Sequence, residues 1–206
     1  MKNLKKVLAL VVALTMVFTT VAFASYPDVD ANADYASAVE LLSALEILKG
    51  DDNGNFNPDN TITRAEYAAV VCRALGWEAS ANGAKGATMF TDVAADHWAS
   101  GYINLATQNG IINGMGDGTF APNAEISRQD MCTMLKNVVD NKSIMLDKQY
   151  DLSDFTDSDE IADYAKEAIN LFKEAGVIDG YDNGAFGPRD AVTRAAAAKV
   201  IAILIG

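Results

Sequence analysis

Residues 110–128 read Gly-Ile-Ile-Asn-Gly-Met-Gly-Asp-Gly-Thr-Phe-Ala-Pro-Asn-Ala-Glu-Ile-Ser-Arg, and related stretches occur twice more in this chain of 206 residues. Each stretch holds a Gly-X-Phe-X-Pro loop, at residues 54–58, 118–122 and 184–188. Each ends in Thr-Arg or Ser-Arg, at residues 63–64, 127–128 and 193–194, and both the loop glycines and the arginines are 64 and 66 residues apart. Upstream, each copy opens with an aromatic residue and an aspartate two positions later: Tyr26 and Asp28, Phe90 and Asp92, Phe155 and Asp157. Three signals in one order, found three times, indicate three internal repeats.

The first half of each repeat is predicted to be an amphipathic helix. Its aromatic and apolar residues fall at i, i+4 and i+7, on one helix face: Tyr35, Val39 and Leu42; Trp98, Tyr102 and Leu105; Tyr164, Ala168 and Leu171. The helix is expected to end near Gly110 and Gly176, because glycine readily adopts the left-handed conformation of a helix C-terminus. The first repeat has Glu46 there, so its helix end is less clearly marked. A further glycine follows in each repeat before the turn: Gly50, Gly114 and Gly180.

The second helix of each repeat is predicted to begin at the Thr/Ser-Arg element. Thr63 and Glu66 fit a capping box, Ser127 and Asp130 a shorter version of it, and Thr193 with Ala196 only half of it. Apolar residues follow each arginine at +3, +6, +7 and +10: Tyr67, Val70, Val71 and Ala74; Met131, Met134, Leu135 and Val138; Ala197, Val200, Ile201 and Leu204. This spacing predicts one buried face for every second helix.

The predicted fold class is all-α. A lone pair of short helices buries too little apolar surface to offset its conformational entropy, so the three units are expected to share one core. We expect a pseudo-threefold helical bundle of three helix-loop-helix repeats, at residues 25–76, 90–139 and 154–206, joined by linkers at 77–89 and 140–153.

The N-terminus has the features of a secretory signal peptide over residues 1–24. Three lysines precede an apolar run from Val7 to Ala24 that ends in Ala-Phe-Ala. A retained membrane anchor is the alternative, but the run reaches a spanning length of about 18 residues only if the cleavage motif is counted. The net charge of −12 becomes −15 once these lysines are removed. So acidic a chain repels nucleic acid and anionic lipid, so neither is expected as a partner, and an anionic ligand would need a few positioned cations.

Cys72 and Cys132 lie in apolar helical stretches and are interpreted as buried free thiols, with a disulfide as the alternative. His97 is the only histidine, and the sequence has no CxxC or HxxxH spacing. No metal site and no cofactor are therefore expected.

Two further acidic patterns could indicate other functions. If Gly54 is aligned with the sixth position of a calcium loop, Lys49 and Asn60 take the first and twelfth positions, where acidic ligands belong, so a polar turn is the better interpretation. Carboxylate pairs such as Asp157 and Asp159, or Asp182 and Asp190, could suggest a glycosidase. Such pairs are expected by chance in an acidic chain, and no nucleophile or phosphate motif accompanies them, so no catalytic residue is assigned.

The repeats resemble the S-layer homology (SLH) domain, a family usually found as three tandem copies. The second repeat carries the resemblance best, through Phe90-Thr91-Asp92-Val93, Trp98-Ala99, Gly110-Ile111-Ile112-Asn113-Gly114 and Gly116-Asp117-Gly118-Thr119-Phe120. The first repeat adds Ile62-Thr63-Arg64-Ala65-Glu66, and the resemblance covers the chain from about Tyr26 to its C-terminus.

The resemblance implies a secreted protein of the bacterial cell surface that holds to the wall non-covalently. Such triplets bind secondary polysaccharides attached to peptidoglycan, often pyruvylated, in grooves between repeats. The resemblance implies these ligand-binding residues: Arg64, Arg128, Arg194, Asp28, Asp92, Asp157, Trp98 and Gly76. The alternatives are a surface-layer component that self-associates, direct binding of peptidoglycan, and an enzyme acting on wall glycan.

The repeated arginine also has a physical rationale. A cation in the first turn is unfavourable for the helix dipole, whereas a guanidinium beside helix N–H groups suits a carboxylate. The alternative is that each arginine pairs with its repeat's aspartate and locks repeats together. Tyr35 and Tyr164 stand where Trp98 stands and are interpreted as core residues rather than sugar platforms. The third repeat lacks an acidic cap partner, and Asp140 falls near where the second repeat would need its glycine, so not every groove need bind ligand.

Overall fold

The computed structural model describes residues 26–148 and 154–205, so the predicted signal peptide and part of the second linker lie outside the described residues. The helices are α1 (Ala36–Ala44), α2 (Arg64–Ala74), α3 (Glu78–Gly83), α4 (Ser100–Gln108), α5 (Arg128–Asn141), the 3-10 helix η3 (Ser158–Glu160), α6 (Asp163–Glu174) and α7 (Arg194–Ile205). The described residues form no strand, only three isolated bridges. The predicted all-α class is confirmed. None of these helices is long and apolar enough to cross a membrane.

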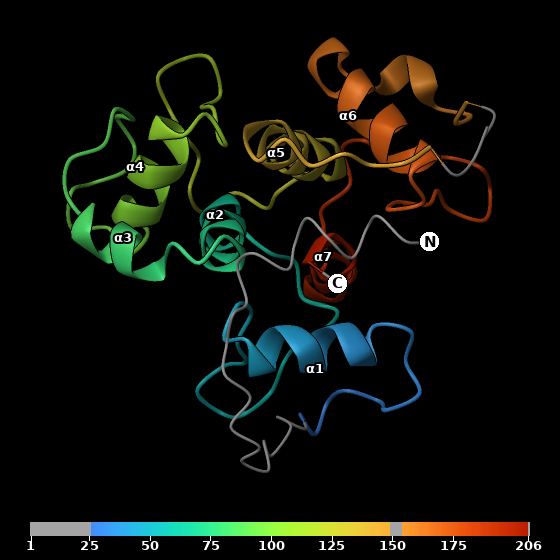
Figure 1. Cartoon of the computed structure of the whole chain (residues 1–206), viewed down its shortest axis with the longest axis horizontal. Helices are drawn as coiled ribbons and strands as arrows, with labels where there is room; N and C mark the ends of the chain where they lie inside the picture. The colour runs from blue at the N-terminus through green and yellow to red at the C-terminus, as the bar shows by residue number, and fades with distance from the viewer. Residues whose placement is uncertain (1–25, 149–153, 206) are drawn as a thin grey trace.

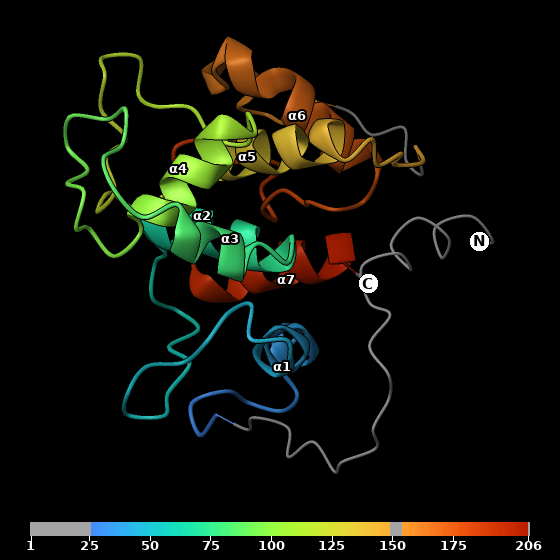
Figure 2. The same cartoon turned by 60° about the vertical axis from the view of Figure 1, so that its left-hand side comes forward.

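The second helices of the three repeats, α2, α5 and α7, lie at the centre of the molecule, and α1, α4 and α6 surround them (Figure 1). Each central helix packs against the first helix of the following repeat: α2 against α4, and α5 against α6. The third repeat closes the circle, because α7 packs against α1, as Figure 2 also shows. The repeats are therefore interlocked units of one core rather than separate beads.

A ring of backbone hydrogen bonds ties the three repeats together at the centre. The N–H of Ile62 donates to the carbonyl of Val192, that of Val192 to Ile126, and that of Ile126 to Ile62, each at 3.0 Å. All three side chains are buried. The ring can close only when all three repeats are present, which gives the fold its pseudo-threefold symmetry.

The loop of each repeat packs on the aromatic residue that opens the repeat. The ring centroids are 5.3–5.5 Å apart in the pairs Tyr26–Phe56, Phe90–Phe120 and Phe155–Phe186. The glycines that precede the turns, Gly50, Gly114 and Gly180, lie directly against these opening rings. A Cβ added at any of them would come within 3.0 Å of the ring and of a backbone carbonyl. Close approach, rather than an unusual φ, therefore requires these glycines.

The helix ends follow the expected local rules. Gly110 (φ 68°) and Gly176 (φ 69°) adopt the left-handed conformation after α4 and α6, and Glu46 (φ 57°) adopts it after α1 without the help of glycine. Thr63 and Glu66 form the predicted capping box at α2. The hydroxyls of Ser127 and Thr193 accept the expected backbone N–H bonds at α5 and α7, both at 3.2 Å. The carboxylate of Asp130 does not complete a capping box at α5 and instead pairs with Arg64.

Some details of the structure differ from the sequence prediction. Tyr35 and Trp98 precede the first residues of α1 and α4, so they lie outside the helices predicted to contain them. Tyr164, interpreted from the sequence as a core residue, is 59% exposed. The linker at 77–89 contains a helix, α3, which packs against α4. Helix α5 continues past Asp140, and the left-handed residue after it is Ser143 (φ 51°). The apolar spacing marked the buried face but not the residue at which each helix begins.

Cys72 and Cys132 are both free and buried, as predicted. Burial raises the pKa of each thiol to about 12. Both side chains act as small apolar residues of the core.

Candidate ligand-binding grooves between the repeats

Each repeated arginine extends from the start of its helix into the loop of the next repeat. The Nε–H donates to a loop carbonyl at 2.8 Å, and the guanidinium lies 4.7–5.0 Å from the ring centroid of the same phenylalanine, in the pairs Arg64–Phe120, Arg128–Phe186 and Arg194–Phe56. Arg194 thereby joins the third repeat to the first. All three arginines hold neighbouring repeats together through Nε–H. Their Nη groups have different partners in the three grooves, so these groups determine whether an arginine can also bind a ligand.

The repeated aspartates hold the same loops from within their own repeat. Each carboxylate accepts two successive backbone N–H groups at 2.6–2.8 Å: Asp28 from Phe56 and Asn57, Asp92 from Phe120 and Ala121, and Asp157 from Phe186 and Gly187. Burial acts to raise the pKa of Asp28 and Asp157, but these N–H groups outweigh it and hold both pKa values below the usual range. The aspartates therefore bind loop backbone rather than the arginine of their own repeat.

A groove with a volume of about 400 Å³ lies beside Arg194 and is built by all three repeats. Its lining residues are Leu48, Lys49, Gly50, Asp51, Asn57, Asn60, Thr61, Glu66, Ala69, Val70, Arg73, Trp98 and Arg194. Of the residues predicted from the sequence, this groove brings together Arg194 of the third repeat and Trp98 of the second, against walls from the first.

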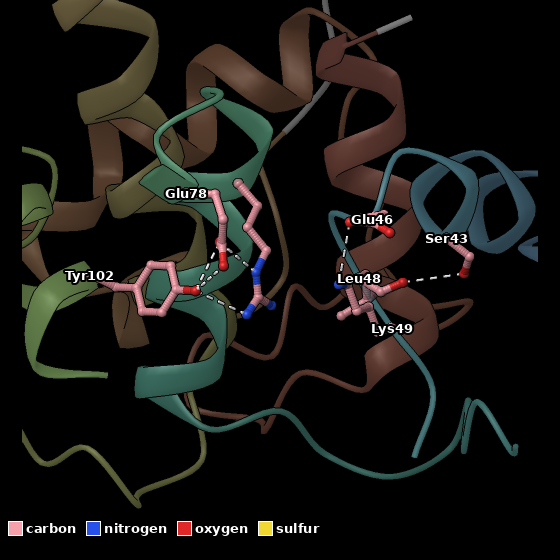
Figure 3. Close-up of polar contacts among 7 residues, drawn as sticks. Ser43, Glu46, Leu48, Lys49, Glu78 and Tyr102 are labelled. Carbon is pink, nitrogen blue, oxygen red and sulfur yellow. Dashed lines mark hydrogen bonds and ion pairs between the residues drawn. The ribbon is translucent and has the colours of Figure 1, made fainter. Parts of the chain in front are cut away.

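The groove offers cations and an aromatic face. The ring of Trp98 lies 6.3 Å from that of Tyr102, and Arg73 donates to the Tyr102 hydroxyl at 3.2 Å and to Glu78 at 3.1 Å. Figure 3 shows the polar contacts of Glu78 and Tyr102 on one side and Lys49 on the other. Arg194 donates through Nη2 to the Lys49 carbonyl at 2.6 Å. Three cations therefore line one concave site.

The two acids of this groove are already occupied by internal hydrogen bonds. The Glu66 carboxylate accepts the N–H of Thr63 at 2.8 Å, as its cap requires. Asp51 accepts the N–H groups of Asn53 and Asn55, both at 2.9 Å, which makes the Asp51–Asn55 segment a closed polar turn. Partial burial lowers the pKa of Arg194, with the neighbouring acids opposing that shift. A partly dehydrated guanidinium interacts more strongly with an anion than one in water.

The equivalent groove beside Arg64 is occupied by the protein itself. Arg64 is only 4% exposed, and its Nη1 forms an ion pair with Asp130 at 3.0 Å. The hydroxyl of Tyr164 donates to the other oxygen of Asp130 at 2.7 Å, and burial together with this bond raises the tyrosine pKa. Tyr164 thus covers an ion pair instead of packing in the core.

The third groove is covered by a tyrosine. The guanidinium of Arg128 lies 4.9 Å from the ring centroid of Tyr181 and 4.7 Å from that of Phe186. Its Nη2 donates to the Asp179 carbonyl at 2.9 Å, and the Tyr181 hydroxyl donates to Asp190 at 2.9 Å. Arg128 is therefore held between two rings.

Gly76 lies away from these contacts. It has a φ of 72° after α2, donates its N–H to the Arg73 carbonyl at 2.9 Å, and is absent from the lining of the Arg194 groove. The sequence analysis missed Arg73 and Lys49. Arg73 could have been found as the one cation at +9 from a repeated arginine, since Asn137 and Ile203 take that place elsewhere.

Comparison with known proteins agrees with this architecture. The S-layer homology domain matches residues 25–68, 90–132 and 154–198. The chain is 44% identical over 61% of its length to the Cell surface protein of Thermoanaerobacter kivui, and 35% identical over 76% to the Surface-layer 125 kDa protein of Lysinibacillus sphaericus. It is 28% identical over 99% of its length to an Endoglucanase of Bacillus sp. (strain KSM-635).

These matches span only part of each relative. The aligned segments cover 17%, 13% and 22% of the three proteins, so the likeness concerns one portion of much longer chains. Three matched copies in one order, over most of the chain, agree with the three interlocked repeats of the fold. The chain therefore belongs to the S-layer homology domain family, which anchors proteins at the bacterial cell surface.

Proposed function

We propose that the chain anchors itself to the bacterial wall by binding an anionic secondary polysaccharide in the grooves between its repeats. The observation that carries this proposal is the groove that joins Arg194, Arg73 and Lys49 to the exposed face of Trp98. A sugar ring can stack on an indole, while a carboxylate on the same sugar meets the guanidinium groups.

The charge of the chain favours a local and specific contact. With a net charge of −12, the protein as a whole repels an acidic polymer, so binding depends on these few cations. Added salt is therefore expected to weaken the contact with Arg194 and also to screen the overall repulsion. Arg64 and Arg128 are proposed to take the place of Arg194 in the two equivalent grooves. Asp28, Asp92, Asp157 and Gly76 are proposed to act by shaping the loops and helix ends around the three grooves.

The Endoglucanase relative raises the question of catalysis. Asp157 and Asp190, two of the acids that could suggest a glycosidase, accept hydrogen bonds from loop N–H groups and from the Tyr181 hydroxyl, respectively. Such contacts suit a structural carboxylate. Attachment, rather than cleavage of glycan, is the role proposed for this chain.

The direct test is co-sedimentation with purified cell walls, before and after chemical removal of the secondary polymer. Binding should follow the polymer. Undiminished binding to stripped peptidoglycan would replace this proposal with direct recognition of peptidoglycan. Self-association is the other alternative, and it predicts that the protein forms a pellet in the co-sedimentation assay even when no walls are added. Sedimentation velocity of the protein alone measures the size of any such assembly.

A matched pair of variants isolates the arginine. Arg194→Ala removes a groove cation, and Arg189→Ala removes an exposed arginine of the preceding loop, with the same change of charge. Wall binding should fall only in Arg194→Ala. Equal losses in both would show that overall charge, not the groove, governs attachment.

A further inference from the structure

The three grooves are built from equivalent positions but hold different side chains. Each combines an arginine from one repeat, the helix start of the next, and an aromatic residue from the one after. The third residue of that helix is Glu66 in the Arg194 groove and Asp130 in the Arg64 groove, and the aromatic residue is Trp98 and Tyr164, respectively. The equivalent sequence positions for the third groove are Ala196 and Tyr35. The difference between Glu66 and Asp130 is a single methylene group.

That methylene decides where the carboxylate goes. Glu66 is long enough to turn back to its own helix start, where it accepts the Thr63 N–H at 2.8 Å and the Thr63 hydroxyl at 3.0 Å. Among the described residues, no carboxylate forms an ion pair with Arg194. The guanidinium of Arg194 therefore faces its groove with no carboxylate of the described residues in direct contact, although Glu66, Asp51 and Asp28 lie near enough to act on its pKa.

Asp130 is too short to close the same cap. Its carboxylate instead meets Arg64 Nη1 at 3.0 Å and the Tyr164 hydroxyl at 2.7 Å. A carboxylate on a guanidinium, fixed by a second donor, is the contact that an acidic sugar would make. A ligand entering this groove would have to displace Asp130 and leave its charge without a partner, which is costly in a partly buried site.

We propose that Asp130 is a built-in substitute for the acidic ligand, so that the Arg64 groove is closed and the Arg194 groove is the open one. This inference rests on the proposed function, because it assumes that the grooves receive acidic sugar. The third groove is also restricted, since the ring of Tyr181 covers Arg128. One chain thus presents one open groove, and the Glu/Asp choice at the third helix position sets which groove is open.

The test uses a small probe with a fixed carboxylate, a methyl glycoside carrying a 4,6-linked pyruvate ketal, and its neutral methyl ester as control. The Nε–H signals of Arg64, Arg128 and Arg194 and the indole signal of Trp98 report each groove separately in an NMR titration of the whole protein. In the wild type, the Arg194 and Trp98 signals should shift and saturate with the acid but not with the ester, while the Arg64 signal stays in place.

Two reciprocal variants keep the net charge and exchange the two grooves. Asp130→Glu should restore a capping box at α5 and allow the Arg64 signal to respond to the probe. Glu66→Asp should place a carboxylate against Arg194 and weaken its response at least tenfold. If thermal melting shows that Asp130→Glu does not fold, Asp130→Asn releases Arg64 with less change of shape.

The outcomes separate the two proposals. No shift of any reporter in the wild type would reject the proposed function itself. A wild-type shift of Arg64, an Arg64 that stays silent after Asp130 is replaced, or an unchanged Arg194 response in Glu66→Asp would each overturn the role of Asp130 and leave groove binding standing.

Discussion

The centre of the molecule and the rims of its grooves, meaning the side chains that line each groove, are both repeated three times. The three copies are nearly identical at the centre but differ in their side chains at the rims. At the centre, the three backbone bonds among Ile62, Ile126 and Val192 have the same length, and every arginine meets its loop carbonyl at the same 2.8 Å. At the rims, equivalent positions hold tryptophan or tyrosine, and glutamate, aspartate or alanine. Repetition therefore maintains the fold, while departures from it distinguish one groove from another.

Deleting residues 155–206 should have the largest effect, because it breaks the central ring. The fragment loses Val192 and both helices that α1 and α5 pack against, α7 and α6. We expect a poorly folded remnant with no cooperative transition in urea. A soluble two-repeat fragment that unfolds cooperatively would show that the repeats are independent.

Phe120→Ala should have the second-largest effect on stability. This ring is fully buried, stacks against Phe90 and lies under the guanidinium of Arg64. The free energy of unfolding should fall by about 3–5 kcal/mol, as is typical when a buried aromatic side chain is truncated. Denaturant unfolding measures it, with the exposed Met115→Ala in the same loop as control, for which a change within about 0.5 kcal/mol is expected.

Glu66→Ala tests a groove residue that also stabilises the fold, through the capping box of α2. Loss of the cap should cost about 0.5–2 kcal/mol, because the N–H of Thr63 loses its side-chain acceptor. Glu66→Gln keeps the length and an acceptor oxygen and should recover much of the stability. If both variants melt like the wild type, the capping box contributes nothing measurable.

Acid should destabilise the loops more gently, since Asp28 is exposed and water screens its charge. The pKa values of Asp28 and Asp157 are lowered in the folded state, so their stabilisation is complete above the ordinary value of 3.8 and is lost as the pH falls through the lowered values. Thermal melting between pH 6 and pH 2 should show this decline. The double variant Asp28→Asn, Asp157→Asn should flatten it, and an unchanged slope would assign the acid sensitivity to other carboxylates.

Trp98→Ala should have the smallest effect on stability and a clear effect on binding. Its ring is 48% exposed in the groove, so the free energy of unfolding should change by less than about 0.5 kcal/mol. Affinity for wall polymer should drop about tenfold, equivalent to about 1.4 kcal/mol. Trp77→Ala, which removes the partly buried tryptophan that packs against the core, should show the reverse pattern.

Local sequence determined much of this fold. The apolar positions of the second helices, the capping box at Thr63 and the left-handed glycines at Gly110 and Gly176 were all predictable, because each depends on residues within a few turns of one helix. The same rules could not predict that Glu46 takes the left-handed place, or that Trp98 stands outside its helix, since packing rather than propensity fixes both.

The tertiary structure alone decided which repeats meet. Arg194 bonds the carbonyl of Phe56, 138 positions away, and α7 closes on α1 only because the central ring brings the third repeat back to the first. The alternative drawn from the sequence, that each arginine pairs with the aspartate of its own repeat, is wrong, because the chain path carries each arginine to a loop of another repeat. The groove that unites Trp98, Arg73 and Arg194 arises from that path, because its walls come from three repeats that no local pattern relates.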